Sequence, residues 1–244
     1  MRAVVVVPTF NERENIEPFL RAVRSAVPDA DILVVDDNSP DGTGQLADTF
    51  AAELGHIKVL HRPGKQGLGS AYRHGFTVAL DEDYDAIVSM DVDFSHDPAV
   101  IPSLLAGIEG GADAVVGSRY VAGGGTENWP LHRRVLSKWG NWYVGMLLGL
   151  GVSDATSGFR AYRASALRDI DHAATSAEGY AFLTELVRRL ATRGHPIAEV
   201  PITFRDRVRG TSKMSGRIIA ESMMLVTRWG ISDLLHGRRP RRAR

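Results

Sequence analysis

Short apolar runs alternate with helical patterns through the first half of this chain, and that alternation limits the folds open to it. Predicted strands lie at residues 2–7, 31–35, 57–61, 86–90 and 114–118. Helical patterns fall between them, at residues 14–27, 44–54, 67–80 and 99–107. Strands that alternate with helices favour a mostly parallel sheet with helices on both faces. We therefore expect an α/β fold.

The second half of the chain is less regular. Its pattern predicts helices at 133–148 and 182–193, strands at 159–162 and 197–201, and a long closing helix at 213–235. A chain of 244 residues suits one large domain with C-terminal additions. We expect a catalytic domain at residues 1–212, a C-terminal amphipathic helix at 213–236 and a basic, disordered tail at 237–244.

Composition narrows the possible partners and compartments. The formal net charge is zero, so no overall field favours nucleic acid. There are no cysteines, which excludes disulfides and thiolate metal sites and fits a reducing compartment. The apolar runs at the N-terminus and at residues 143–152 are too short to span a membrane. These features are typical of a cytoplasmic protein without a membrane span.

Polar clusters follow four of the predicted strands. They lie at residues 8–12, 36–42, 91–93 and 117–119. The first three clusters contain acids, and the fourth contains Arg119. In open α/β sheets the ligand lies beyond the carboxyl ends of the strands, so these clusters fall on the edge where a ligand binds. The sequence therefore predicts a site at this edge.

The cluster after the fourth strand contains Asp91 and Asp93, separated by Val92. Their side chains point the same way if the backbone stays extended through Val92. Two such carboxylates are costly to bury unless a cation or hydrogen-bond donors neutralise them, and Mg²⁺ suits that role. The alternative is a pair of solvated turn aspartates before the helix that Asp97 and Pro98 open. The neighbouring polar clusters favour the metal site.

Two common phosphate-binding motifs do not fit this sequence. Pro-Thr-Phe-Asn-Glu-Arg follows the first strand, where the dinucleotide fingerprint needs Gly-x-Gly-x-x-Gly. Residues 64–69, Gly-Lys-Gln-Gly-Leu-Gly, lack the Gly-Lys-Ser/Thr end of a P-loop, so we interpret them as a flexible loop and helix start. Asp37 could accept hydrogen bonds from a guanine or uracil, or it could cap a turn.

Six motifs, taken together, resemble those of one enzyme family. In chain order they are Val-Pro-Thr-Phe-Asn-Glu-Arg-Glu-Asn, Val-Asp-Asp-Asn-Ser-Pro-Asp-Gly-Thr, Met-Asp-Val-Asp-Phe-Ser-His, Gly-Ser-Arg-Tyr, Ser-Gly-Phe-Arg-Ala-Tyr and Arg-Gly-Thr-Ser-Lys. The chain is similar to dolichol- or polyprenol-phosphate mannosyltransferases, which are inverting nucleotide-sugar transferases of the Rossmann-like GT-A fold. The resemblance covers residues 4–213. Gly-Ser-Arg-Tyr, Asn-Trp-Pro-Leu and Arg-Gly-Thr-Ser-Lys are the motifs most specific to the polyprenol-phosphate group.

The resemblance implies a role for each matching residue. The nucleotide sugar would be bound by Pro8, Phe10, Glu12, Val35, Asp37, Asp91, Val92 and Asp93. The metal, Mg²⁺ or Mn²⁺, would be bound by Asp91, Asp93 and Ser95. The acceptor phosphate would be bound by Arg119, Arg133 and Ser137. Arg207 and Lys213 match a mobile basic loop over the donor diphosphate, and the resemblance implies that they act in catalysis with Asp91 and Asp93.

The implied reaction moves mannose from GDP-mannose to a polyprenyl phosphate with inversion. A phosphate acceptor is already anionic near neutral pH, because its second pKa is about 6. It needs positioning and charge neutralisation rather than a strong base. For a hydroxyl acceptor the best candidate base is Glu185, whose alternative is an exposed helix carboxylate near Arg188 and Arg189. One alternative function is transfer from UDP-glucose or another sugar nucleotide to the same lipid phosphate. The other is a nucleotide-sugar-binding subunit without catalysis.

A lipid acceptor implies a membrane surface. Arg133, Arg134 and Lys138 lie among apolar and aromatic residues at helical spacing, which suits either an interfacial helix or a core-packing helix. The tail at 237–244 carries five arginines and no acid, which indicates either a solvated end or attraction to anionic lipid. We expect peripheral attachment at the cytoplasmic face of the membrane, through this tail or through a membrane-embedded partner protein.

Overall fold

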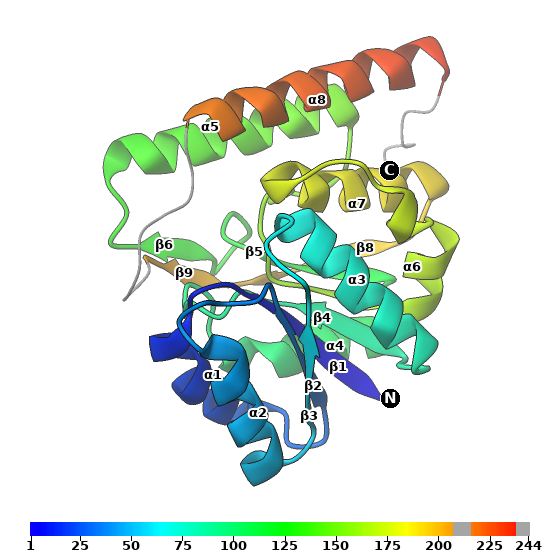
Figure 1. Ribbon diagram of the computed structural model, residues 1–244. Coiled ribbons are helices and arrows are strands. Elements are labelled where there is room, and N and C mark those ends of the chain that lie inside the picture. The colour runs from blue at the N-terminus through cyan, green and yellow to red at the C-terminus, as the bar shows by residue number, and fades with distance from the viewer. Residues whose placement is uncertain (207–215, 238–244) are drawn as a thin grey trace.

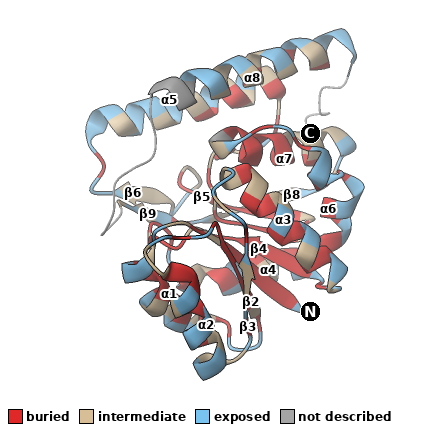
Figure 2. Ribbon diagram, in the orientation of Figure 1, coloured by how far each residue is buried: buried red, intermediate tan, exposed pale blue. Residues whose placement is uncertain are grey.

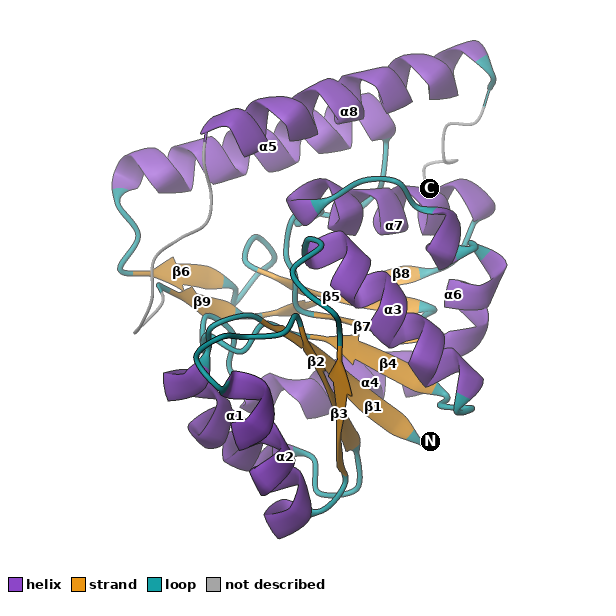
Figure 3. Ribbon diagram, viewed as in Figure 1, coloured by secondary structure: helices purple, strands orange, loops and turns teal. Residues whose placement is uncertain are grey.

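The computed structural model describes residues 1–206 and 216–237. In these ranges seven strands form the central sheet, in the order β3-β2-β1-β4-β7-β5-β8 (Figure 1; Figure 3). They are β1 (Ala3–Thr9), β2 (Asp31–Asp36), β3 (Ile57–His61), β4 (Ala86–Ser89), β5 (Ala114–Ser118), β7 (Arg160–Arg163) and β8 (Ile197–Pro201). β7 runs antiparallel to β4 and β5, and the other neighbours are parallel. The predicted α/β fold with a mostly parallel sheet is confirmed.

Helices cover both faces of the sheet and bury its inner strands (Figure 2). α1 (Arg13–Ala26), α2 (Thr43–Leu54) and α4 (Ile101–Glu109) pack on one face. α3 (Leu68–Asp81), α6 (Ala164–Asp169) and α7 (Gly179–Arg193) pack on the other. α3 comes close to β1 at Gly75, where an added Cβ would lie 2.6 Å from Val6 Cγ1. Burial on both faces explains the continuous apolar sequences of the inner strands.

Two long helices form an outer layer against α7. α5 (Leu131–Leu148) and α8 (Gly216–Leu235) lie side by side (Figure 1), and one cluster of buried residues joins both to α7. Arg188 of α7 forms an ion pair with the fully buried Asp233 of α8. The hydroxyls of Tyr143 and Thr227 lie 2.7 Å apart and connect α5 to α8. These contacts attach α8 to the domain by polar as well as apolar groups.

The predicted elements of the first half match the structure closely. The strands at 57–61 and 114–118 have the predicted bounds. The predicted helix at 99–107 begins instead as a 3₁₀ turn (Pro98–Val100), whose Asp97 cap accepts from the Ala99 N–H at 2.9 Å. The sequence pattern does not predict α6, the 3₁₀ turn His172–Ala174, or the paired strands β6 (Gly125–Glu127) and β9 (Thr203–Arg205). Elements of three to six residues carry too little periodicity to be seen.

Within the described ranges, no helix has both the length and the apolar character needed to cross a membrane. The predicted closing helix is described from Gly216 onward. The predicted domain boundary at residue 212 lies outside the described residues, as does all of the predicted tail except Gly237. The division into a catalytic domain, a closing helix and a tail therefore stays a prediction.

Candidate active site

The strand order creates a crevice between the ends of β1 and β4. These strands are neighbours, but the chain passes from β1 to β2 and β3 on one side before it returns to β4 on the other. Loops diverge at such a switch point, which is where open α/β sheets bind ligands. A cavity of about 630 Å³ opens there, a usual volume for a ligand site. Its walls come from the loops after β1, β2 and β4, the start of α3, the loop before α7, and α8.

Asp91 and Asp93 both line this cavity. β4 ends at Ser89 and the chain bends at Val92, so the backbone does not stay extended through Val92, which was the condition for the two side chains to point the same way. Tyr72 Oη donates to Asp91 Oδ1 at 3.3 Å. Burial and the charge of Asp91 raise the pKa of Tyr72 well above its usual value, so this hydroxyl remains a donor. Asp93 is buried and accepts from the backbone N–H two residues later at 3.0 Å.

The cavity brings together seven of the eight residues assigned to a nucleotide sugar. Pro8, Phe10, Glu12 and Asp37 line it together with the Asp91–Asp93 segment. Val35 does not line it, because its side chain is fully buried on the sheet face that α3 covers. The nucleotide contact of Val35 stays a prediction.

Arg62 is a buried partner of Asp37 that no motif indicates. Its guanidinium forms an ion pair with Asp37 and donates to Gln66 Oε1 at 3.0 Å and to Ser70 Oγ at 2.6 Å. Both members of the pair are 5% exposed. Burial raises the pKa of the Asp37 carboxyl, while Arg62 favours its ionised form. Arg62 therefore fixes this carboxylate to the following loop and to α3.

The glycine-rich segment at residues 64–69 also belongs to the cavity. Lys65, Gly67 and Leu68 line it, and Lys65 Nζ lies 4.3 Å from the centre of the Phe10 ring. A cation over an aromatic face is attracted to it. The glycine pattern was the one sequence signal for this contribution: it predicted a flexible loop and a helix start, with a weak indication that the segment touches substrate.

The loop before α7 closes another side of the cavity and corrects one expectation. Residues 176–179 line the cavity. Glu185 Oε2 accepts from the backbone N–H groups of Ser176 and Ala177 at 3.1 and 3.0 Å, and its Oε1 accepts from Arg189. The expectation that Glu185 is an exposed helix carboxylate is wrong, because it is 4% exposed and anchors this loop. Glu185 is not among the residues that line the cavity.

The three residues assigned to an acceptor phosphate surround a second, smaller cavity. It measures about 170 Å³, lies between α5 and α8, and is lined mainly by apolar side chains together with Arg119, Arg133 and Ser137. We call the first cavity, which contains Asp37, Asp91 and Asp93, the acid-lined cavity. Ala181 and Ser222 line both cavities, so the two adjoin.

Arg119 is held by a buried carboxylate. Its Nε and Nη2 each donate to Asp154 at 2.7 Å, and its backbone N–H donates to the same carboxylate at 3.1 Å. Burial acts to raise the pKa of Asp154, but the bonds from Arg119 hold it below its usual value. Asp154 therefore stays ionised, and much of the charge of Arg119 is balanced inside the protein.

The hydrogen-bond partners of Arg133 and Ser137 are more exposed to solvent than Asp154, the partner of Arg119. Arg133 donates to Asp206 at 2.9 Å and lies 4.1 Å from the centre of the Trp129 ring. The Arg133 and Asp206 side chains are 27% and 42% exposed, so this ion pair is partly solvated. Ser137 Oγ accepts from the Tyr120 hydroxyl at 2.7 Å.

The loop after β4 also contains Ser95 and His96, whose side chains are buried. Among the described residues, Ser95 Oγ and His96 Nδ1 are buried polar atoms without a hydrogen-bond partner. Burial lowers the pKa of His96 to about 4, so its imidazole is neutral near pH 7. Ser95 itself is not among the residues that line the acid-lined cavity.

The donor set fits a divalent ion that binds together with its substrate. The described part of the chain has no cluster of three His, Cys, Asp or Glu side chains able to hold a metal. Mg²⁺ typically takes one or two carboxylates and completes its shell with waters and substrate phosphates. Asp91 and Asp93 can supply that pair, and the unpartnered hydroxyl of Ser95 can supply a further oxygen ligand. Arg207 and Lys213 lie outside the described residues, so their catalytic role stays a prediction.

Proteins similar to this chain transfer sugars. Residues 4–171 match the family model described as Glycosyl transferase family 2. An undecaprenyl-phosphate mannosyltransferase from Micrococcus luteus is 48% identical over 99% of this chain and 99% of its own length. A polyprenol monophosphomannose synthase from Mycolicibacterium smegmatis is also 48% identical, over 96% of this chain and 89% of its own.

Two solved structures with lower identity share the fold. A glucosyl-3-phosphoglycerate synthase from Mycobacterium tuberculosis, in complex with phosphoglyceric acid, matches with a TM-score of 0.65 at 21% identity, over 97% of this chain and 79% of that one. A mannosyltransferase from Pyrobaculum calidifontis, in complex with GDP-Man and Mn²⁺, matches with a TM-score of 0.62 at 17% identity, over 95% and 64%. With the family model and the relatives of 48% identity, this shows that the chain belongs to glycosyl transferase family 2 and is a glycosyltransferase with a GT-A-like fold.

Proposed function

We propose that this enzyme transfers mannose from GDP-mannose to the phosphate of a polyprenyl phosphate, with inversion, and so makes polyprenyl-phosphate-mannose. The names of the two relatives with 48% identity support a mannosyl donor and a polyprenyl phosphate acceptor. The structural observation that carries the proposal is the meeting of two unlike cavities. The acid-lined cavity adjoins a mainly apolar one that contains Arg119 and Arg133. A nucleotide sugar and a lipid phosphate need that combination.

The acid-lined cavity is the candidate site for GDP-mannose. Asp37 lies there with its carboxylate held by Arg62, where it can accept hydrogen bonds from the guanine ring N–H and amino group. The Phe10 ring and Lys65 offer an aromatic face and a cation beside it. We assign Arg207 and Lys213 to the donor diphosphate on the strength of the sequence resemblance.

We infer that Mg²⁺ or Mn²⁺ is held by Asp91 and Asp93, with Ser95 as a further ligand. The solved mannosyltransferase with GDP-Man and Mn²⁺ supports a divalent ion in this fold. When bound, the ion would stabilise negative charge on the leaving diphosphate. Tyr72 orients the Asp91 carboxylate from the α3 side, and the Ser95 backbone N–H orients that of Asp93.

The acceptor phosphate can attack without a strong general base. A phosphomonoester has a second pKa of about 6, so its oxygen is already anionic near neutral pH. As the bond to GDP breaks, the anomeric carbon gains oxocarbenium character, and attack from the opposite face inverts the configuration. Arg133 and Ser137 can position the incoming phosphate, and Arg119 lines the same cavity. Glu185 is not required as a base, and its carboxylate is already bonded to the loop at 176–177.

α5 presents an apolar ridge that suits a membrane surface. Leu131, Val135, Trp139, Trp142 and Met146 are exposed along it. The opposite side of the same helix buries Val144 and Leu148, so α5 packs against the core along one side and exposes apolar groups along the other. Trp residues at headgroup level are typical of interfacial helices. We infer peripheral attachment at the cytoplasmic face, to which the basic tail or a membrane-embedded partner protein would add a second anchor.

A donor panel tests the proposal. Labelled GDP-mannose and UDP-glucose are each offered with a short polyprenyl phosphate in detergent, with and without Mg²⁺ or Mn²⁺. We expect transfer from GDP-mannose only, and only with metal. Transfer from UDP-glucose alone would overturn the donor assignment.

The matched variants are Asp93→Asn and Asp97→Asn, which lie in one loop. Asp93→Asn should lower turnover by about 10²–10³-fold, the usual loss when one electrostatic contact to the transition state is removed. Asp97 is exposed and caps the next turn, so Asp97→Asn should retain activity. If Asp93→Asn turns over like the wild type, Asp93 has no part in the reaction and the mechanism is wrong.

A further inference from the structure

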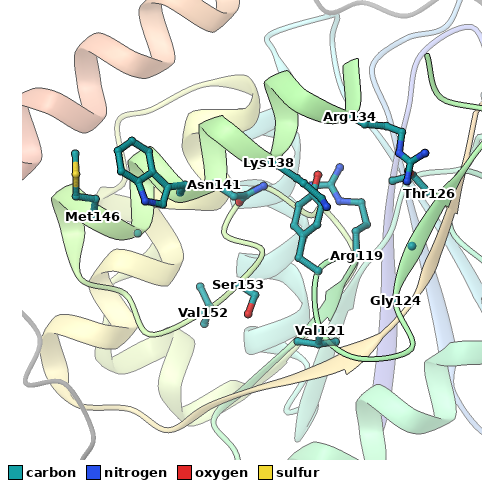
Figure 4. Close-up of a pocket in the computed structure, with 14 residues that line it drawn as sticks. Arg119, Val121, Gly124, Thr126, Arg134, Lys138, Asn141, Met146, Val152 and Ser153 are labelled. Atoms are coloured by element: carbon teal, nitrogen blue, oxygen red, sulfur yellow. The ribbon is translucent and has the colours of Figure 1, made fainter. Parts of the chain in front are cut away.

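A third cavity, of about 650 Å³, lies on the other side of α5 from the one that contains Arg133 and Ser137. Figure 4 shows Arg134, Lys138, Asn141 and Met146 along α5, facing loop residues that include Val121, Gly124 and Val152. This cavity shares Arg119 with the smaller cavity and no lining residue with the acid-lined one. A group bound in it would therefore sit apart from the reacting sugar.

The mouth of this cavity is positively charged. Arg134 and Lys138 are four residues apart on α5, so their side chains are neighbours on one face of the helix. Both are exposed, and neither forms a hydrogen bond or ion pair with another described residue. No acidic residue is among the described residues that line the cavity. Two like charges at this spacing destabilise a helix unless an anion lies between them.

The floor of the cavity has two further polar groups. Arg119 is there, but the buried Asp154 already balances its charge, so the net positive charge comes from the two cations at the mouth. Asn141 is 6% exposed and uses its amide Nδ2 to donate to Ser137 O and Thr156 Oγ1. Its Oδ1 is buried and accepts no hydrogen bond from a described residue. A ligand hydroxyl could donate to that oxygen.

The cavity opens beside the apolar ridge of α5. Trp142 and Met146 line it and are also 60% and 49% exposed. A helix that lies in a membrane interface places such side chains among the lipids, with the adjoining basic side chains at headgroup level. This step rests on the membrane attachment in the proposed function.

We propose that this cavity binds the phosphodiester headgroup of an anionic membrane lipid, and that it is distinct from the acceptor-phosphate site. Arg134 and Lys138 hold the phosphate, Asn141 Oδ1 receives a headgroup hydroxyl, and Trp142 and Met146 lie beside the acyl chains. The lipid does not react. It fixes the orientation of α5 on the membrane, and thus of the adjoining cavity into which the polyprenyl phosphate enters.

The test compares two double variants of the full chain that remove equal charge. Arg134→Gln with Lys138→Gln changes the proposed site. Lys58→Gln with Arg168→Gln is the control, since both side chains are exposed and lie outside α5 and all three cavities. Partitioning is measured by co-sedimentation with phosphatidylcholine vesicles that contain or lack phosphatidylglycerol. Each basic residue near an anionic surface contributes about fivefold to partitioning, so the site variant should lose about 30-fold on phosphatidylglycerol vesicles. The control variant should keep most of its binding, and pure phosphatidylcholine should not distinguish the two.

Two further arms decide what occupies the site. Inorganic phosphate, compared with chloride at equal ionic strength, should leave vesicle binding unchanged; selective competition would make the cavity a free-anion site and overturn the lipid proposal. Transfer to a short polyprenyl phosphate in detergent should have the same kcat and KM in the site variant as in the wild type. A raised acceptor KM would place the acceptor phosphate in this cavity and also overturn the proposal. If the site variant and the control variant bind phosphatidylglycerol vesicles equally well, the proposal is also overturned. A failure of the proposed function itself would be seen separately, as absence of transfer by the wild type.

Discussion

Asp154→Asn is the substitution for which we expect the largest loss of stability. The Asp154 side chain is fully buried and accepts three hydrogen bonds from Arg119, at 2.7 to 3.1 Å. An asparagine has nearly the same shape and can accept some of these bonds, but it carries no negative charge. The substitution therefore tests whether the charge of this carboxylate is needed to bury the guanidinium.

The magnitude follows from the burial of both partners. Their side chains are 7% and 0% exposed, so the guanidinium left behind cannot be hydrated while the protein stays folded. Removal of one partner of such a pair costs about 3–5 kcal/mol of unfolding free energy. At this chain length each kcal/mol lowers Tm by about 2–4 °C, so Tm should fall by about 6–20 °C. Asp206→Asn is the matched control, because its pair with Arg133 is partly exposed and should contribute only about 0–1 kcal/mol.

Urea unfolding followed by circular dichroism measures the difference, provided that the m-value is unchanged. Replacement of both partners by apolar residues, Arg119→Met with Asp154→Leu, should recover much of the loss because no unpaired charge remains. The reasoning is refuted if Asp154→Asn costs no more than Asp206→Asn.

Acid provides an independent check on the same pair. Arg119 keeps the pKa of Asp154 below its usual value of 3.8 in the folded protein. The stabilisation by the pair is therefore complete above pH 3.8 and is lost as the pH falls through the lower folded-state pKa. The stability difference between the wild type and Asp154→Asn should shrink over that range. A difference that stays constant would contradict the assigned cause.

Two more substitutions probe partners that no motif marks. Arg62→Met leaves the buried Asp37 without its cation, so KM for GDP-mannose should rise by about 10–100-fold in steady-state assays. Arg62→Lys should give an intermediate KM, and an unchanged KM in Arg62→Met would contradict the positioning role of Arg62. The ring nitrogens of His195 lie 2.8 Å from Asp113 and 2.9 Å from Asp169. Burial lowers the pKa of His195, but the two carboxylates raise it by more, so the net pKa is raised. That stabilisation is present below the unfolded pKa of about 6.5 and is lost as the pH rises through the folded value, so His195→Gln should lose more stability at about pH 6 than at about pH 9. Urea unfolding at both pH values measures this, and equal losses would count against it.

How far the fold can be predicted depends on whether the signal is local. β1, β2, β4 and β5 are visible because each is a run of apolar residues buried on both faces. The pattern also predicts a strand at 159–162, but not that β7 runs antiparallel to its neighbours. Arg160 in β7 is fully buried and donates to the backbone carbonyls of Ala155, Ser157 and Leu183. Only the fold brings these three carbonyls together around the guanidinium, so no local pattern shows that an arginine can be buried there.

The sequence likewise predicts some residues of the candidate site but not their partners. Asp37, Asp91 and Asp93 could be placed on one edge because each follows a predicted strand. Their partners could not, since Arg62 is 25 residues from Asp37 and Asp154 is 35 residues from Arg119. Tertiary packing decides which charges meet across such distances. Glu185 shows the same limit, because its helical spacing to Arg189 can be read from the sequence but the loop that buries it cannot.

The two arginines proposed for the acceptor phosphate are not equally available to it. A phosphate that displaced Asp154 from Arg119 would leave a buried carboxylate without its cation, whereas displacement of Asp206 from Arg133 releases a side chain that is 42% exposed. Asp206 is therefore expected to compete with the acceptor for Arg133, and breaking the Arg133–Asp206 ion pair should cost the acceptor about 0–1 kcal/mol of binding free energy. Asp206→Asn should lower KM for polyprenyl phosphate by up to about fivefold and leave KM for GDP-mannose unchanged. Initial rates over a range of short-chain polyprenyl phosphate concentrations measure both values. If KM for the lipid rises instead, Asp206 positions Arg133 rather than competing with the substrate, and Arg133 is not the freer of the two cations.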